Sequence, residues 1–395
     1  MSDFLKINYS QILENGIVKE KEFKQARSIV SQALEKLLKW KSQGKIGFLD
    51  LPYQKITQLK KKVDSCLRGQ YKTLVHCGIG GSSLGPKTLI QALAPNASIY
   101  FLDNIDPTTF KKIEKTLNMD ETLFYIVSKS GNTSETKMQY EWAKSLSSNI
   151  AVCTNDQEGF LFEEAKKHGF PLFTIPENVG GRYSVFTSVG LVPALFSGLN
   201  VEKILKGGQT VSLKSEELIS FVALAYLLHK KQKRNVMASF IYSDELQEFG
   251  HWLVQLWSES LGKQKNLNNQ SVFEGSFPIL GRGACAQHSM LQLLSEGPEN
   301  FWAWFIEIEN FGIENSFSKL IKIEAKATYE SLLSKGRPCV SLKLKEVSEG
   351  CLGALLFFYE CFVALFGLAL EINPFDQPGV EDTKRRIDTL LNERR

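Results

Sequence analysis

Two short segments of this 395-residue chain combine glycine with hydroxyl side chains in a way that suits anion binding. The first, GIGGSSLGP, runs from Gly78 to Pro86 and directly follows an apolar run. Glycines leave backbone N–H groups uncovered, and Ser82 and Ser83 can supply hydroxyls where the next helix begins. Pro86 replaces the lysine of a P-loop, and Ser83 replaces the third glycine of a dinucleotide-binding turn, so neither nucleotide loop fits. A tight strand-to-helix turn without a ligand is the alternative.

The second segment, SKSGNTSET, runs from Ser128 to Thr136 and also follows an apolar run. Asn132 followed three residues later by Glu135 resembles a capping box, so we predict that a helix begins there with exposed N–H groups. A phosphate at that position would meet the positive end of the helix dipole. A solvated, serine-rich loop is the alternative. The side chains around the predicted helix start are Ser128, Lys129, Ser130 and Thr133.

Both segments lie where short apolar runs alternate with helical segments. This alternation predicts βαβ units and a parallel sheet that is covered by helices on both faces. Ligands of such open sheets bind in the crevice at the carboxyl ends of the strands, so we expect the two hydroxyl-rich turns to share one crevice. The apolar runs span residues 73–79, 98–103, 122–128, 150–154 and 172–175.

A second series of strands and helices follows, and the predicted fold class is α/β with two doubly wound parallel-sheet αβα sandwich subdomains. Before both, an amphipathic pattern from Lys19 to Lys41 predicts an outlying helix. Small and polar residues at 198–208 indicate the boundary between the two series. We predict an N-terminal helical segment at 1–45 and domains at 46–200 and 201–395. The second series comprises a helical stretch at 216–232 and strands at 235–243, 301–309 and 339–345.

The charge balance and the cysteines exclude several classes of protein. Lys and Arg number 47 against 43 Asp and Glu, and the formal charge of +4 is too small for the basic surface of a nucleic-acid-binding protein. The seven cysteines form no C-x-x-C pair and are typical of thiols in a reducing compartment. The first residues lack the pattern of a secretory signal. We therefore expect a cytoplasmic location and no nucleic-acid partner.

One apolar stretch, from Leu352 to Leu370, has about the length that crosses a bilayer. It carries Glu360 near its centre, and no other segment of the chain has comparable hydropathy. We therefore predict a fully buried core helix and no membrane partner, with a membrane span as the alternative.

The paired loops G-x-G-G-S and S-x-S-G-x-T resemble the sugar isomerase (SIS) domain superfamily, whose members use them to bind the phosphate of a phosphorylated sugar. Four further segments occur in family order and resemble the glucose-6-phosphate isomerase family. The similarity spans roughly residues 47–391. The four segments are ENVGGRYSVFTSVGLVP (177–193), WSESLGK (257–263), AQHSMLQLL (286–294) and FDQPGVEDTK (375–384).

The resemblance implies reversible isomerisation of glucose 6-phosphate and fructose 6-phosphate through ring opening and a cis-enediol or enediolate. Such a reaction requires neither a cofactor nor a metal, and none is expected. The residues that the resemblance assigns to the substrate and its phosphate are Gly81, Ser82, Ser128, Lys129, Ser130, Thr133, Gly181 and Gln377.

The resemblance also implies four catalytic residues whose types suit the reaction. Glu259 would move a proton between adjacent carbons. Arg182 would stabilise the negative charge that develops on the enediolate. His288 and Lys384 would exchange a proton with the ring oxygen. Taken singly, the three charged residues are commonly surface groups and a lone histidine is commonly a core residue, so the four gain their meaning from occurring together.

Two positions depart from the family pattern. Ser83 stands where Asp is common, and Ala286 replaces the glycine before Gln-His; neither change removes a reactive group. An isomerase of another aldose phosphate and a sugar-phosphate sensor without catalysis remain as alternatives. Family members are dimers in which the histidine reaches the neighbouring subunit's site. The resemblance therefore implies a homodimer in which His288 acts across the interface.

Overall fold

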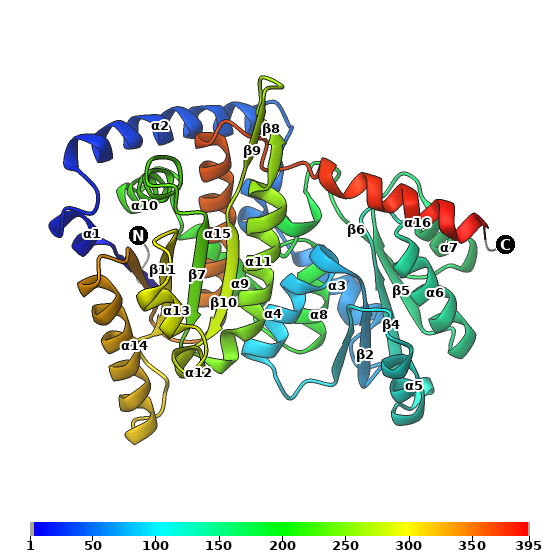
Figure 1. The fold of residues 1–395 in the computed structure, drawn as a ribbon. Helices are drawn as coiled ribbons and strands as arrows, with labels where there is room; N and C mark the ends of the chain where they lie inside the picture. Colours follow the sequence, from blue (N-terminus) through cyan, green and yellow to red (C-terminus); the bar gives the residue numbers. More distant parts are fainter. Residues whose placement is uncertain (1–3, 394–395) are drawn as a thin grey trace.

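A computed structural model describes residues 4–393, which gather around two large sheets (Figure 1). The first sheet confirms the five strands predicted for the first series. Its order is β3-β2-β4-β5-β6, and every neighbouring pair is parallel. Its strands are β2 (Thr73–Cys77), β3 (Ile99–Leu102), β4 (Thr122–Val127), β5 (Ile150–Thr154) and β6 (Leu172–Thr174).

The strand order brings the two hydroxyl-rich segments together. After β2 the chain adds β3 on one side and then returns to add β4 on the other side, so the winding reverses between β2 and β4. Residues 78–86 follow β2 and residues 128–136 follow β4. An open parallel sheet leaves a crevice at such a reversal, because the loops that leave the two strands diverge. The expectation of a shared crevice therefore matches the topology.

Helices cover both faces of this sheet. Every residue of β4 is buried, as expected for a parallel strand that is covered on both sides. Phe124 and Tyr140 belong to the apolar cluster on one face, and Tyr125 belongs to the larger core on the other. The helices of this half are α3 (Thr57–Cys66), α4 (Leu84–Leu93), α5 (Pro107–Thr116), α6 (Ser134–Leu146), α7 (Phe160–His168) and α8 (Ser188–Phe196).

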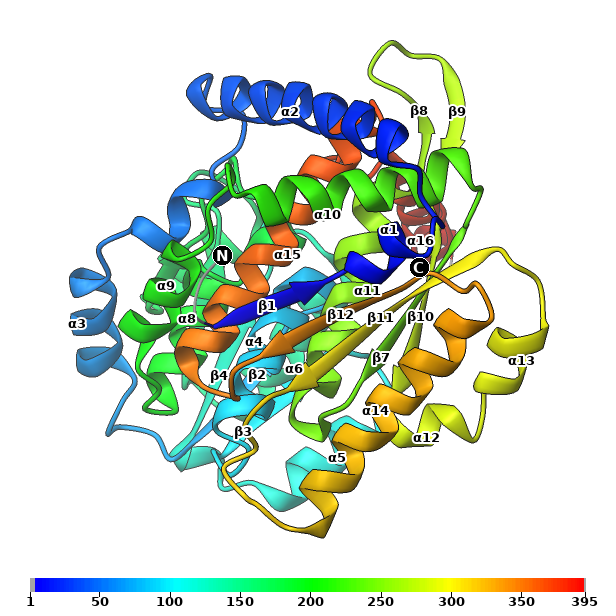
Figure 2. The same ribbon diagram turned by 90° about the vertical axis from the view of Figure 1, so that its left-hand side faces the viewer.

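The second sheet has the order β1-β12-β11-β7-β10. It confirms the three predicted strands and adds two that the sequence did not predict, at its two edges. All its pairs are parallel except that of β1 with β12, which is antiparallel. Its strands are β1 (Leu5–Asn8), β7 (Val236–Ile241), β10 (Phe277–Arg282), β11 (Phe301–Ile308) and β12 (Cys339–Leu344). A separate hairpin of β8 (Lys263–Lys265) and β9 (Ser271–Glu274) projects from the body (Figure 2).

Helices also cover both faces of the second sheet, with α10 and α15 on one face and α12, α13 and α14 on the other (Figure 2). The helix α11 packs against α4 of the first half and so joins the two halves. The last helix, α16, lies over the first half (Figure 1). The helices are α10 (Glu216–Tyr226), α11 (Gln247–Leu261), α12 (Gly283–Gln287), α13 (Leu291–Glu296), α14 (Ser316–Ser334), α15 (Glu349–Ala369) and α16 (Glu381–Glu393).

The N-terminal segment corrects one prediction. The expected helix is present as α2 (Glu20–Ser42), but it packs against α10 and α15 and is therefore not outlying. The same segment also contributes β1 and the short helix α1 (Ser10–Glu14). Because β1 extends the second sheet, the two ends of the chain each contribute to the half that is distant in sequence.

The helix α15 confirms the prediction of a buried core helix. It is long and apolar enough to cross a membrane, yet it is buried inside the molecule from Cys351 to Ala369. Glu360 at its centre is fully buried, and burial raises the pKa of this carboxyl well above its ordinary value. A protonated, neutral side chain is consistent with this position.

The expected boundary at 198–208 overlaps the helix α9 (Val201–Gln209). This helix packs closely on α15, because a Cβ added to Gly207 would lie 2.0 Å from the carbonyl oxygen of Gly350. The largest apolar cluster includes Tyr125 of the first sheet and Trp304 of the second. The two halves therefore share one core, and the limits of the two domains stay a prediction.

Candidate active site

A cavity of about 810 Å³ opens at the carboxyl ends of β2 and β4. Both hydroxyl-rich segments line it, and so do side chains from α11 and from the last twenty residues. Eleven of the twelve predicted site residues lie on its wall. They are Gly81, Ser82, Ser128, Lys129, Ser130, Thr133, Gly181, Arg182, Glu259, Gln377 and Lys384.

The first loop is held by close contact with the glycine pair that precedes Arg182. A Cβ added to Gly81 would lie 2.4 Å from the carbonyl carbon of Gly181 and 2.6 Å from the Arg182 nitrogen. Only glycine allows this approach, since backbone atoms cannot move aside easily. Below the loop, His76 Nε2 donates to the Ser82 carbonyl oxygen at 2.7 Å. Burial lowers the pKa of His76 to about 4, so this ring is neutral near pH 7.

The second loop presents hydroxyls and an ammonium to the cavity. Ser128 Oγ and Thr133 Oγ1 lie 2.9 Å apart and share a hydrogen bond. Lys129 Nζ donates to the Glu177 carbonyl oxygen at 2.7 Å. Burial lowers the pKa of the Lys129 ammonium, and the Glu177 carboxylate opposes this shift.

The predicted capping box is wrong. The helix α6 begins at Ser134 with Thr133 as its N-cap, and no side chain caps it there. Asn132 Oδ1 instead accepts from the Phe160 backbone N–H at 3.2 Å, which ties this loop to the start of α7. Glu135, the second residue of the predicted box, lies on the cavity wall. The first residues of α6 still line the cavity, so the N-terminus of this helix can bind an anion there without the box.

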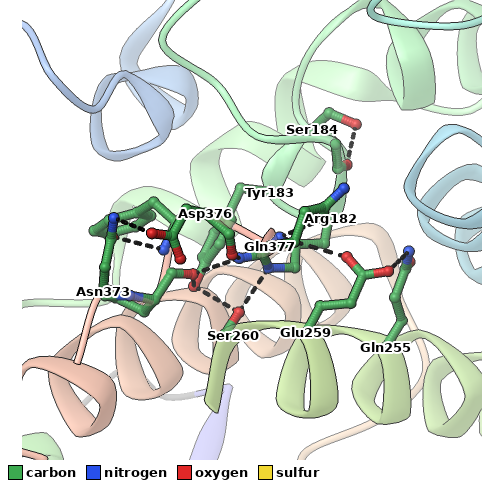
Figure 3. Close-up of polar contacts among 12 residues, drawn as sticks. Arg182, Tyr183, Ser184, Gln255, Glu259, Ser260, Asn373, Asp376 and Gln377 are labelled. Carbon is green, nitrogen blue, oxygen red and sulfur yellow. Dashed lines mark hydrogen bonds and ion pairs between the residues drawn. The ribbon is translucent and has the colours of Figure 1, made fainter. Parts of the chain in front are cut away.

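Arg182 is the centre of the polar network in Figure 3. Its side chain is 2% exposed, so it is not a surface charge. The guanidinium Nε donates to Ser260 Oγ at 2.7 Å and Nη1 donates to Gln377 Oε1 at 2.9 Å. Its Nη2 donates to the carbonyl oxygens of Pro374 and Asp376 at 2.7 and 2.9 Å. These bonds fix the plane of the guanidinium group. Its remaining side faces the cavity and Glu259.

Glu259 extends from α11 toward the same space (Figure 3). Its Oε2 lies 3.4 Å from Arg182 Nη1, and its Oε1 accepts from Gln255 Nε2 at 3.0 Å. The side chain is 29% exposed through the cavity. A carboxylate that is oriented by two donors and remains accessible can accept a proton from a bound ligand.

Gln377 and Lys384 come from the C-terminal segment. Gln377 precedes the turn that leads into α16, and Lys384 lies on α16 itself. Lys384 Nζ pairs with Glu381 Oε1 at 2.8 Å, and both side chains are more than half exposed. The ammonium is therefore weakly held at the cavity rim and remains available for a ligand.

His288 is the one predicted site residue that does not line the cavity. It lies at the C-terminal end of α12 and is exposed to solvent. The neighbouring Gln287 Nε2 donates to Thr328 Oγ1 at 2.7 Å and to the Glu324 carbonyl oxygen at 3.2 Å. These bonds anchor α12 to α14, on a face of the second sheet. Among the residues that the structure describes, Glu259 lines the cavity and His288 of the same chain does not.

Sequence analysis missed several residues of the site. Gln255 could have been found, because it lies four residues before Glu259 and therefore on the same face of α11. Lys263 belongs to the quoted WSESLGK segment but has no predicted role; it does not line the cavity and instead donates to the Glu259 carbonyl oxygen. Residues 155–158, which follow β5, also line the cavity, and no signal in the sequence marked them. Among residues 4–393, no group of three or more His, Cys, Asp or Glu side chains is arranged to hold a metal ion.

Known sequences of one enzyme family resemble this chain over most of its length. The sequence pattern of phosphoglucose isomerase matches residues 49–316 and 309–394. The glucose-6-phosphate isomerase of Methanocaldococcus jannaschii is 33% identical, and the alignment covers 98% of this chain and 100% of that protein. The enzyme of the same name from Carboxydothermus hydrogenoformans is 30% identical, with 98% and 94% covered.

Solved structures share the fold over almost the whole chain. A hypothetical protein from Thermus thermophilus has a TM-score of 0.87 and 29% identity, with 98% of this chain and 99% of that chain covered. A glucose-6-phosphate isomerase from Chlamydia trachomatis has a TM-score of 0.85 and 21% identity, with 99% and 89% covered. The match of residues 49–394 to one family pattern, with 33% identity to a relative over 98% of the chain, shows that the chain belongs to the phosphoglucose isomerase family.

Proposed function

We propose that this chain catalyses the reversible isomerisation of glucose 6-phosphate and fructose 6-phosphate. One observation carries the proposal: an accessible carboxylate, a buried guanidinium and a hydroxyl-rich loop pair line the same cavity. The loops suit a phosphate, and the Glu259–Arg182 pair suits a proton transfer that creates negative charge on oxygen. The match to phosphoglucose isomerases and to relatives of the same name supports this substrate.

The phosphate end of the substrate is assigned to the two loops. The hydroxyls of Ser82, Ser128, Ser130 and Thr133 can donate to phosphate oxygens, which accept strongly because they are charged. Lys129 and the N-terminus of α6 supply positive potential at the same place. The loops then hold one end of the sugar, so that its first two carbons lie deeper in the cavity.

The proton transfer is assigned to Glu259. In the open-chain aldose its carboxylate takes the hydrogen from C2, and the electron pair of that bond forms the C1–C2 double bond of an enediolate. The negative charge then lies on the oxygen of C1, where the Arg182 guanidinium stabilises it. The same carboxyl then returns its proton to C1, and the proton of the C2 hydroxyl passes to the oxygen of C1, which gives the ketose.

Ring opening needs further acid–base groups, and we assign Lys384 and His288 to this step. Lys384 lies at the rim of the same cavity, but His288 does not. We therefore propose a homodimer in which His288 of each subunit completes the site of its partner. The face that carries His288 supports this, because Leu293 of α13 and Phe317 and Leu320 of α14 are between half and four-fifths exposed there. Sedimentation at micromolar concentration tests the dimer, and a monomer would contradict it.

A coupled assay tests the proposed reaction. Fructose 6-phosphate is added with excess glucose-6-phosphate dehydrogenase and NADP, and NADPH formation reports the aldose product. We expect saturable turnover that depends on the protein. If fructose 6-phosphate raises the melting temperature without any turnover, the chain is a sugar-phosphate sensor. If another aldose phosphate is turned over faster, that isomerase activity replaces our assignment.

The compartment is part of the proposal. All seven cysteines are unpaired, and five of them are buried. Free thiols persist in a reducing environment, so we assign the protein to the cytoplasm. Fluorescence microscopy of a tagged chain would test this assignment.

A further inference from the structure

We propose that Lys263 is a positioning residue that fixes the end of α11, and with it Glu259, against Asp376. The role rests on the proposed isomerisation, because it concerns the geometry of the assigned base relative to Arg182 and Gln377. Lys263 does not line the cavity, so it acts through the groups that it holds.

The contacts of Lys263 connect two segments that are distant in sequence. Its Nζ donates to the Glu259 carbonyl oxygen at 2.5 Å and to the Asp376 carbonyl oxygen at 2.8 Å. It also lies 3.5 Å from Asp376 Oδ1, and the lysine side chain is only 4% exposed. A buried ammonium with three acceptors from two segments is a fixed bridge, unlike the mobile side chain of a surface lysine.

The position of Lys263 explains why an ammonium is needed there. The last carbonyl groups of a helix have no partner within the helix, and the carbonyl of Glu259 is one of these in α11. A cation at that end satisfies the carbonyl and interacts favourably with the helix dipole. The bond is made to the backbone of the catalytic residue itself, so a displacement of the ammonium is transmitted directly to the Glu259 side chain.

Arg182 acts on the same segment from the other side. Its guanidinium also donates to the Asp376 carbonyl oxygen, which therefore accepts from two cations. This segment carries Gln377 and continues into α16 with Lys384. Lys263 thus helps to hold Glu259, Arg182 and the segment that carries Gln377 and Lys384 in one arrangement.

The charges around Lys263 make this bridge sensitive to pH. Arg182 is the like charge that faces it, and the carboxylates of Asp376 and Glu259 are the opposite charges. Burial and then Arg182 lower the pKa of Lys263 to about 8, and the two carboxylates only partly offset this. As the pH rises through this value, the amine loses one donor and its ion pair with Asp376.

The consequence for stability has a definite sign. The folded pKa lies below the ordinary value of 10.5, so the folded chain binds fewer protons than the unfolded chain between about pH 8 and 10.5. The cost of burying the ammonium is therefore fully present below about pH 8 and is relieved as the pH rises through this window. Lys263 thus makes the free energy of unfolding larger toward alkaline pH. Activity is expected to move in the opposite direction, and this separates positioning from simple stabilisation.

The experiment compares Lys263→Met and Lys263→Arg with the wild type in the coupled assay. Lys265→Met is the matched control, because Lys265 is exposed and lies on the same strand, β8. We expect kcat of Lys263→Met to fall about a hundredfold, as for a misplacement of reacting groups by about 1 Å. Inhibition by inorganic phosphate should be unchanged, since the phosphate loops are on the first sheet. The kcat of the wild type should fall above about pH 8. This alkaline decline should be absent in Lys263→Met and shifted upward in Lys263→Arg, whose charge persists.

Several results would overturn the proposal. They are wild-type kcat in folded Lys263→Met, an alkaline decline near pH 8 that persists in this variant, or a flat wild-type profile from pH 7 to about 9.5. The last result needs no variant, so a failure of the variants to fold does not protect the proposal. Turnover by the wild type is measured in parallel: its absence contradicts the proposed isomerisation, whereas turnover that is indifferent to Lys263 contradicts only the positioning role.

Discussion

The two large sheets share one winding order but differ at the point where a ligand would bind. In the first sheet β3 and β4 flank β2, and in the second β10 and β11 flank β7 in the same way. The reversal in the first sheet opens into a cavity of about 810 Å³, whereas the pocket at the ends of β7 and β11 measures only about 10 Å³. The strand order therefore allows a crevice in both halves, and the loops determine whether a cavity forms there.

Side chains explain the difference. The first reversal is followed by glycines and small hydroxyl residues, so backbone and cavity remain accessible. At the second, Tyr242 and Phe311 line the remaining space together with the stem of Lys322. The Tyr242 hydroxyl accepts from Gln287 Nε2 at 3.1 Å, which closes this edge against α12. The second half instead contributes to the cavity through α11 and the C-terminal segment. We propose that it also contributes the exposed His288, to the site of a second subunit.

The largest effect is expected for substitution of His288. It tests whether the second half of one subunit completes the cavity in the first half of another subunit. His288→Ala should lower kcat about a hundredfold or more, since a positioned acid–base group contributes roughly 10²–10⁴-fold. Mixing His288→Ala with inactive Glu259→Gln should restore about a quarter of wild-type activity. Half of the dimers are then mixed, and one of their two sites has both groups. His251→Ala is the control, because His251 is also exposed but lies on a different helix, α11.

Subunit exchange must be confirmed in that mixture, for example by mass spectrometry of labelled chains. No recovery after confirmed exchange would show that His288 does not act across an interface. The second half would then have no role in the site of another subunit.

Gly81→Ala tests how tightly the open crevice is built. The added Cβ would meet backbone atoms of Gly181 and Arg182 at 2.4–2.6 Å, so the two loops must separate. We expect kcat/KM to fall about a hundredfold, because the Arg182 loop moves relative to the phosphate loop. The free energy of unfolding should drop by about 1–3 kcal/mol, as for an overpacked site. Gly379→Ala is the control, since its Cβ would meet nothing within 4 Å; equal effects of the two variants would contradict this account.

A pair of buried serines provides the smallest contrast. Ser128 follows β4 and is 3% exposed, and Ser243 follows β7 and is 4% exposed. Ser128→Ala should raise KM for fructose 6-phosphate about tenfold, because a hydrogen bond to a charged group is lost. Ser243→Ala should leave KM within about twofold, since we propose that the phosphate binds in the first crevice. Initial-rate kinetics measure the KM of both variants. A larger increase for Ser243→Ala than for Ser128→Ala would place the phosphate at the second sheet.

Much of the fold could be predicted because eight strands of the two sheets are continuous apolar runs. The two edge strands were missed for physical reasons. β10 contains Pro278 and Gly281, which are tolerated at an edge but argue against a strand in the sequence. β1 has only four residues, and its pairing with β12 is a contact across more than three hundred positions. Local patterns carry no information about such a partner.

The site was predictable where motifs are local and not where side chains act through other groups. The two loops, Arg182 and Glu259 could be named from their segments, and the structure brings them to one cavity. The roles of Ser260 and Lys263 depend on bonds to Arg182 and Asp376, which come from elsewhere in the chain. The assumed capping by Asn132 failed for a related reason, because its side chain bonds to the distant Phe160 instead.

The central claim is that the carboxylate inside the open crevice moves the proton. Glu259→Gln keeps the size of the side chain and can keep a bond from Gln255, but it removes the basic oxygen. We predict that its kcat in the coupled assay falls by at least about a hundredfold while fructose 6-phosphate still raises its melting temperature. A kcat within about twofold of the wild type would contradict the account, because the proton would then be moved by another group.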